Sequence, residues 1–153
     1  MYSHLQEPEE KWMEDLEKTA GKDARRAAER IAEFLLVSGL AVKAIENPSS
    51  LKVPFNTPDG EPINIGFIRN DHLSFEFPVG NLGRTKAYSS DIKRLELLNL
   101  LKSELSPDVE IENDSENRWP NIPFDKILDN KIWIRFSCIL LTVIKNISAE
   151  TSN

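Results

Sequence analysis

The sequence has few of the residues on which most disulfides and metal sites depend. Only one of its 153 residues is a cysteine, Cys138, and only two are histidines, His4 and His72. A single cysteine cannot form an intramolecular disulfide, and because it lies in the most apolar segment we expect a buried thiol. Two histidines so far apart do not provide the clustered ligands that zinc or iron requires. We therefore expect no metal and no cofactor.

Catalytic motifs are missing as well. No G-x-S-x-G nucleophile elbow occurs, and the glycine-containing stretch 80–86 lacks the glycine-lysine-serine/threonine end of a Walker loop. PD-(D/E)xK nucleases need a lysine two residues after an acidic residue, and neither Glu76 nor Glu110 is followed by a lysine at that spacing. The acidic run 110–116 fits no EF-hand spacing. These absences favour a noncatalytic protein, and a hydrolase with an unrecognised site is the remaining catalytic alternative.

Positive charge and long apolar runs are scarce too. The 19 basic and 25 acidic residues give a net charge of −6, which disfavours sequence-independent binding to nucleic acid. The N-terminal stretch is acidic and amphipathic, unlike an export signal. Arg135 and Lys145 leave too few uninterrupted apolar residues between them to cross a membrane. We expect a cytoplasmic protein without membrane contact.

The segment 131–147 has the strongest hydrophobic pattern in the chain. At the helical increment its large apolar residues fall within an arc of roughly 140°, which predicts a central, core-facing helix. This arc contains Ile132, Trp133, Phe136, Ile139, Leu140, Val143, Ile144 and Ile147. A second, narrower row is formed by Ile134, Cys138 and Leu141. The second row cannot face the same layer, so either the N-terminal helices or a second copy must cover it, with a slight preference for a homodimer.

The N-terminal part predicts two helices. The first covers 9–18, where acidic residues in the first turn complement the helix dipole. Asp23 can cap a second, clearly amphipathic helix, and Gly39 is its expected C-terminal stop. The following segment 40–46 fits a continued helix and a short strand equally weakly.

Three segments with a period of two, 51–55, 63–67 and 73–77, predict an antiparallel meander. The turn chemistry of 58–60 separates the first two. Between the last two we expect a three-residue loop, 70–72, because that loop pairs Phe67 with Phe75. The resulting register gathers the large side chains Ile65, Phe67, Phe75 and Phe77 on one buried face. The opposite face, expected to be half-exposed, then shows Asn64, Gly66, Ser74 and Glu76.

The second half of the chain predicts further elements. Ser90 or Asp91 caps a leucine-striped helix that ends before Pro107. The alternation of apolar and acidic residues in 109–112 predicts a short edge strand, and Pro123 begins a short helical turn. The whole chain, 1–153, is therefore expected to form a single α+β domain. It consists of a small antiparallel β-meander packed with N-terminal and C-terminal helices, and residues 1–7 and 148–153 are expected to fray.

The first candidate site is the loop between the last strand of the meander and the leucine-striped helix. Its glycines allow backbone amides to approach an anion, and the following helix N-terminus and two cations add positive charge. The predicted phosphate or nucleic-acid site consists of Arg69, Gly80, Gly83, Arg84 and Lys86. The alternative interpretation of this loop is an ordinary connector.

The second candidate site is an interaction surface. Trp119 stands beside a cation in a polar loop, which is typical of a stacking platform or a protein-binding anchor. We group it with Ile134, Cys138 and Leu141. Because packing accounts for every strong pattern, we expect a noncatalytic cytoplasmic recognition or assembly module, whose partner is a second copy or another protein. The alternative is a nucleic-acid or phosphate-ligand protein that uses the loop 80–86.

Overall fold

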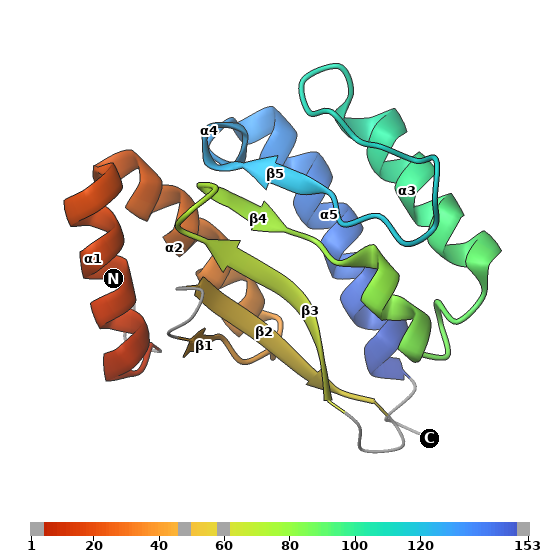
Figure 1. Cartoon of the computed structure of the whole chain (residues 1–153), viewed down its shortest axis with the longest axis horizontal. Helices are drawn as coiled ribbons and strands as arrows, with labels where there is room; N and C mark the ends of the chain where they lie inside the picture. Colours follow the sequence, from red (N-terminus) through yellow and green to blue (C-terminus); the bar gives the residue numbers. More distant parts are fainter. Residues whose placement is uncertain (1–4, 46–49, 58–61, 150–153) are drawn as a thin grey trace.

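The protein's helices pack against one face of an antiparallel sheet, which confirms the expected α+β class (Figure 1). The computed structural model describes residues 5–45, 50–57 and 62–149. The helices are α1 (Glu7–Ala20), α2 (Lys22–Val37), α3 (Asp91–Leu105), α4 (Phe124–Ile127) and α5 (Asn130–Ser148), with a 3-10 helix η1 (Val79–Arg84). No helix in these ranges is long and apolar enough to span a membrane.

The two N-terminal helices are joined at Gly21. Gly21 has a φ of 96°, which ends α1 and separates it from α2. Residues with an L side chain rarely adopt this conformation, so glycine is favoured here. The expected capping role of Asp23 is wrong: α2 begins at Lys22, and Asp23 lies in its first turn, where it accepts a hydrogen bond from Arg26. The expected stop at Gly39 is confirmed, since its φ of 88° allows the amides of Gly39 and Leu40 to bond the carbonyls of Leu36 and Leu35.

The sheet has five antiparallel strands, whereas the sequence predicted a three-stranded meander and a short edge strand at 109–112. Their order is β1 (Lys43–Ile45), β2 (Ser50–Asn56), β3 (Pro62–Arg69), β4 (Ser74–Glu76) and β5 (Asn121–Pro123). The ambiguous segment 40–46 therefore contains a strand, and α1 lies beside it. The buried carboxylate of Glu9 accepts a hydrogen bond of 2.9 Å from the amide of Ala44, which occupies a donor on this sheet edge.

The predicted register of the meander is wrong because β3 contains an extra residue. Lys52 pairs with Phe67, but two residues further along β2, Pro54 pairs with Asn64, three residues away on β3. Such a bulge moves all later side chains of the strand to the opposite face. Ile68 therefore joins Ile65 in the core, and Phe67 points to the outer face of the sheet.

The β3–β4 connection also differs from the expected loop. Four residues, Asn70 to Leu73, separate the strands, and Leu73 has a φ of 48°. Phe75 pairs with Ile68, and Phe67 pairs with Glu76, so the two phenylalanines lie on opposite faces. On the face expected to be half-exposed, Asn64 and Glu76 are half-buried, but Gly66 and Ser74 are buried. The turn expected at 58–60 lies outside the described residues.

The expected edge strand at 109–112 does not form. Val109 and Ile111 are buried in the core without pairing to the sheet, because β5 occupies the position beside β4. Strand β5 was not predicted from the sequence, because it lies within a polar loop. The expected helical turn after Pro123 is present as α4.

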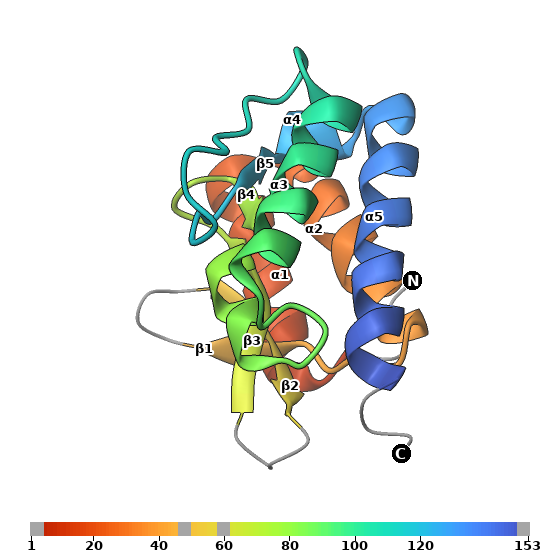
Figure 2. The same ribbon diagram turned by 90° about the vertical axis from the view of Figure 1, so that its right-hand side faces the viewer.

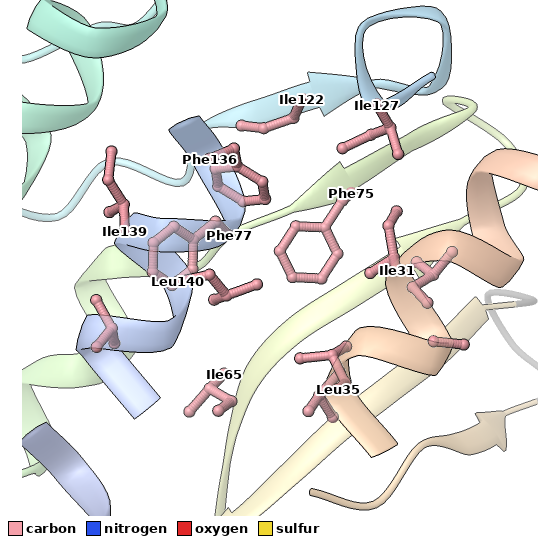
Figure 3. Close-up of a cluster of buried hydrophobic side chains, with 14 of the residues drawn as sticks. Ile31, Leu35, Ile65, Phe75, Phe77, Ile122, Ile127, Phe136, Ile139 and Leu140 are labelled. Atoms are coloured by element: carbon pink, nitrogen blue, oxygen red, sulfur yellow. The ribbon is translucent and has the colours of Figure 1, made fainter. Parts of the chain in front are cut away.

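The core lies between the sheet and the helical layer, and α5 is central to it. All of its predicted core residues are buried except Trp133, which is half-buried. The Phe75 ring lies 5.8 Å from the ring of Phe136, and Figure 3 shows Phe75 facing α5 on one side and Ile31 of α2 on the other. Figure 2 shows α3 beside α5, and these two helices are in contact.

Candidate functional site

The loop predicted to bind an anion is packed against the rest of the protein. It forms η1, in which Val79 and Leu82 are buried. A Cβ atom on Gly80 would lie 3.0 Å from the carbonyl oxygen of Asn117 and 3.1 Å from Nε1 of Trp119. Glycine at position 80 therefore allows η1 to pack closely against the segment that contains Asn117 and Trp119.

Gly83 makes a similar contact with a buried arginine that sequence analysis missed. A Cβ atom on Gly83 would lie 2.8 Å from Nη1 of Arg94 on α3. The Arg94 guanidinium donates to the carbonyls of Tyr88 and Ser89 at 2.9 and 3.0 Å, and to the Asp91 carboxylate at 2.8 Å. Arg94 thus fixes the turn before α3. Its position within a leucine-rich helix gave no sign of this role.

The cations of the predicted anion site are not gathered in one place. The Asn81 side chain donates to the carbonyl of Asn64, so η1 lies near the start of β3. Arg69 is five residues further along β3, roughly 17 Å away at the usual rise of a strand. Arg84 and Lys86 are exposed near η1. An anion site at η1 stays a prediction from the sequence, but Arg69 lies at the other end of the strand.

Arg69 belongs to a small ionic cluster at the β3–β4 turn. Its guanidinium forms ion pairs of 2.7 Å with Asp71 and 3.2 Å with Glu76. Hydrogen bonds from Arg69 lower the pKa of the Asp71 carboxyl from 3.8 to about 2. The exposed His72 lies 3.5 Å from the same carboxylate. Arg69 thus holds the turn closed with two carboxylates.

We expect the Asp71 ion pair to make stability pH-dependent in acid. Because folding lowers the Asp71 pKa, its contribution is present above about pH 4 and is lost as the pH falls toward 2. The contribution should stay under about 1 kcal/mol, since the Asp71 side chain is 45% exposed. Urea unfolding should therefore show Asp71→Asn less stable than the wild type at pH 7, with most of that difference lost by pH 2. Asp108→Asn, at an exposed turn, is the control, and an Asp71→Asn deficit that persists unchanged at pH 2 would contradict this assignment.

Trp119 lies on the outer face of the sheet, away from α5. Its ring stacks on that of Phe67 with a centroid distance of 6.0 Å and an interplanar angle of 11°, and the residue is 41% exposed. The helical layer contacts the opposite sheet face, where Phe75 meets Phe136. The four residues of the predicted interaction surface therefore belong to two separate surfaces.

The second apolar row of α5 is open to solvent within the described chain. Ile134 is 61% exposed, Cys138 is exposed, and Leu141 is half-buried. The expectation of a buried thiol is wrong, because Cys138 lies on the side of α5 that faces away from the sheet. The N-terminal helix does not cover the row: α1 contacts α2, β1 and β2 instead.

A groove between α2 and α5 borders this row. Its volume is about 510 Å³. The lining residues are Arg26, Glu29, Arg30, Glu33, Phe34, Val37, Leu128 and Trp133. Helix α5 contributes only Trp133 to the lining. At the helical increment Leu141 lies about 80° around α5 from Trp133, and Ile134 about 20° beyond it, so the row lies on the helix face next to Trp133. We call the groove and this row together the α2–α5 surface.

Aromatic and cationic side chains fix the floor of the groove. Phe34 and Trp133 meet edge to face, with centroids 5.6 Å apart. The Arg30 guanidinium lies 5.8 Å from the Trp133 ring centroid. It also donates to the carbonyl of Ile127 at 3.0 Å and to Oδ1 of Asn130 at 2.9 Å. These contacts join α2, α4 and α5 and hold both aromatic rings half-buried at the groove.

The exposed side of α5 carries charge of one sign. Lys131, Arg135 and Lys145 are exposed, and the helix contains no aspartate or glutamate. None of the three cations forms an ion pair with another described residue. A chain with a net charge of −6 thus has a cationic and apolar face along this helix.

The described residues contain no group of three or more histidine, cysteine or acidic side chains that could hold a metal ion. His4 lies outside these residues. The α2–α5 surface is therefore the most developed candidate site in the described protein, and its lining of apolar, aromatic and charged side chains suits binding. Comparison with known proteins adds no family to this description, since no protein family, curated protein or solved structure matches the chain.

Proposed function

We propose that this protein is a noncatalytic recognition module that binds a partner protein on its α2–α5 surface. One observation carries the proposal: apolar side chains remain exposed on both sides of the groove. Val37 on α2 is 77% exposed, and Ile134 on α5 is 61% exposed. Between them lie the half-buried Phe34 and Trp133. Contiguous apolar surface with a polar rim is typical of a protein-binding site.

The composition of the groove supports this function. Tryptophan and arginine are the residues most often found at the energetic centre of protein interfaces, and Trp133 and Arg30 occupy that position here. The Trp133 ring and the Arg30 guanidinium are held in place before binding, which lowers the entropy lost on association. We place the module in the cytoplasm, because an exposed single cysteine such as Cys138 persists as a thiol in a reducing compartment.

The alternatives have less support. A nucleic-acid site at the loop 80–86 would lack Arg69, whose charge is matched by Asp71 and Glu76. A hydrolase would need a nucleophile with an adjacent base, and the groove is lined by neither histidine nor cysteine nor serine. One of its carboxylates, Glu29, is already hydrogen-bonded to Arg25.

Site-specific photocrosslinking in the native host tests the proposal. A photoreactive benzoyl-phenylalanine at position 37 or at position 134 should form an adduct with the same protein, because Val37 lines the groove and Ile134 follows the lining residue Trp133 on α5. Ile92 is the matched control, since it is 69% exposed but lies on α3, which contributes no lining residue. Position 92 should not form this adduct.

The partner identified by mass spectrometry would then be purified and titrated against the wild type and Ile134→Glu. We expect at least about a tenfold loss of affinity, which corresponds to about 1.4 kcal/mol. The melting temperature should change little, because Ile134 is largely exposed in the unbound protein. Equal adducts from positions 92 and 134, or unchanged affinity of Ile134→Glu, would reject the function. Adducts between copies of the chain would instead support the homodimer expected from the sequence.

A further inference from the structure

We infer that the partner binds as an amphipathic helix whose apolar face is flanked by carboxylates. This inference rests on the proposed function and gives the chemistry of the partner. Three features support it: the length of the groove, the absence of a strand edge among its described lining residues, and the charge along its α5 side.

The groove has the length of a short helix. Its α2 wall runs from Arg26 to Val37, about 16 Å at the rise of an α-helix. That length accommodates about three helical turns, with anchors at the spacing i, i+3 or i+4, and i+7. All described lining residues belong to helices or to the connection between α4 and α5, so no strand edge borders the groove. A bound strand would leave its backbone groups without partners there, whereas a bound helix satisfies them internally.

The charge of the rim favours an acidic partner. The exposed cations Lys131, Arg135 and Lys145 run along α5 beside its apolar row, without a carboxylate on the same helix. On α2, Arg26 also reaches the groove and is paired only with the exposed Asp23. Carboxylates on the flank of a bound helix that faces α5 would meet Lys131, Arg135 and Lys145, and one near the start of α2 would meet Arg26. These pairs would set the orientation of the complex.

The same charges disfavour a second copy as the occupant. In an antiparallel pair of α5 helices centred on Cys138, Lys131 of one copy would lie opposite Lys145 of the other. In a parallel pair, each cation would lie opposite its own copy. Both arrangements bring like charges together, which weakens association. An anionic lipid surface is disfavoured too, because Glu29 and Glu33 lie on the opposite wall of the groove.

The experiment uses two synthetic peptides of about 18 residues, long enough for some helicity in solution. Both carry the same leucines at helical spacing, and the flanks are glutamate in one peptide and lysine in the other. Cys138 is the only cysteine of the chain and is exposed, so an environment-sensitive fluorophore can be attached there. Calorimetry on the unlabelled protein checks that the fluorophore does not create the signal.

The glutamate peptide should bind at least about tenfold more tightly than the lysine peptide at low salt. This difference should shrink as sodium chloride is raised, because exposed charges are screened. Ile134→Glu should lose binding, and Ile92→Glu should retain it. Lys131→Ala with Arg135→Ala should weaken the glutamate peptide and leave the lysine peptide unchanged or stronger.

Equal binding of the two peptides, or binding of neither, would overturn the inference. So would wild-type binding to phosphatidylserine vesicles that Ile134→Glu loses, or self-association that Ile134→Glu abolishes. The photocrosslinking result separates the two levels. Adducts from positions 37 and 134 without a preference for the glutamate peptide would leave the recognition function standing and reject the acidic helix.

Discussion

Replacing Phe75 by alanine should lower the free energy of unfolding by about 3–5 kcal/mol, the usual cost of removing a fully buried phenylalanine. Its side chain has no exposed surface. Its ring meets those of Phe77 and Phe136 at centroid distances of 6.4 and 5.8 Å. On the sheet side it covers Gly66, which has no side chain that could fill the cavity. Urea or thermal unfolding of the two proteins measures the difference.

Phe67→Ala is the matched control for this prediction. Phe67 is half-buried on the outer face and stacks on the partly exposed Trp119, so its loss should cost clearly less. In the register expected from sequence, both phenylalanines would face the core and would be equally costly to remove. Equal destabilisation by the two substitutions, or a loss below about 1 kcal/mol for Phe75→Ala, would contradict the observed strand pairing.

The helices could be predicted because their signals are local. The apolar arc of α5 repeats from Ile132 to Ile147, and Ser90 caps α3 through its own side chain. Gly39 ends α2 because it adopts a positive φ. Each signal depends only on residues within a few turns of the same helix. The expected helices at 9–18 and 131–147 were accordingly found with slightly wider bounds.

The register of the sheet depended on features without a local signal. The extra residue in β3 lies within Ile65–Gly66–Phe67. This sequence is equally compatible with a regular strand and with a bulge, so it does not reveal the extra residue. The turn after β3 places Leu73, and not a glycine, at a positive φ. Strand β5 lies within a polar loop and gains its pairing from β4 alone. These features are decided by tertiary packing, which outweighs the intrinsic preference of a strand.

The candidate site was visible from the sequence only in part. The row of Ile134, Cys138 and Leu141 followed from the periodicity of α5 and is open in the structure. The other wall was missed, because Phe34 lies at helical spacing from the buried Ile31 and Leu35, and Val37 is the last residue of α2. A groove between two helices requires their relative position, which a single sequence does not contain. The single-sign charge of α5 was a usable signal that the overall net charge of −6 concealed.

Replacing Gly66 by alanine should destabilise the protein by about 1–3 kcal/mol, because the new methyl group overpacks the core. A Cβ atom there would lie 2.5 Å from Cζ and 2.7 Å from Cε1 of Phe75, closer than van der Waals contact permits. The Phe75 ring cannot move easily, since it is fully buried between its aromatic neighbours. The φ of Gly66 is negative, so the backbone itself tolerates alanine. The clash with Phe75 is therefore the cause of the expected loss.

A double-mutant cycle with Phe75→Leu isolates that cause. Leucine lacks the two ring atoms that the methyl group would meet, so Gly66→Ala should cost at least about 1 kcal/mol less in the Phe75→Leu background. In a Phe67→Leu background the cost should stay the same, because Phe67 lies on the other face of the sheet. Chemical unfolding of the single and double variants gives both coupling energies. Absence of coupling to position 75 would mean that Gly66 does not face Phe75, and it would favour the register in which Gly66 faces away from the core.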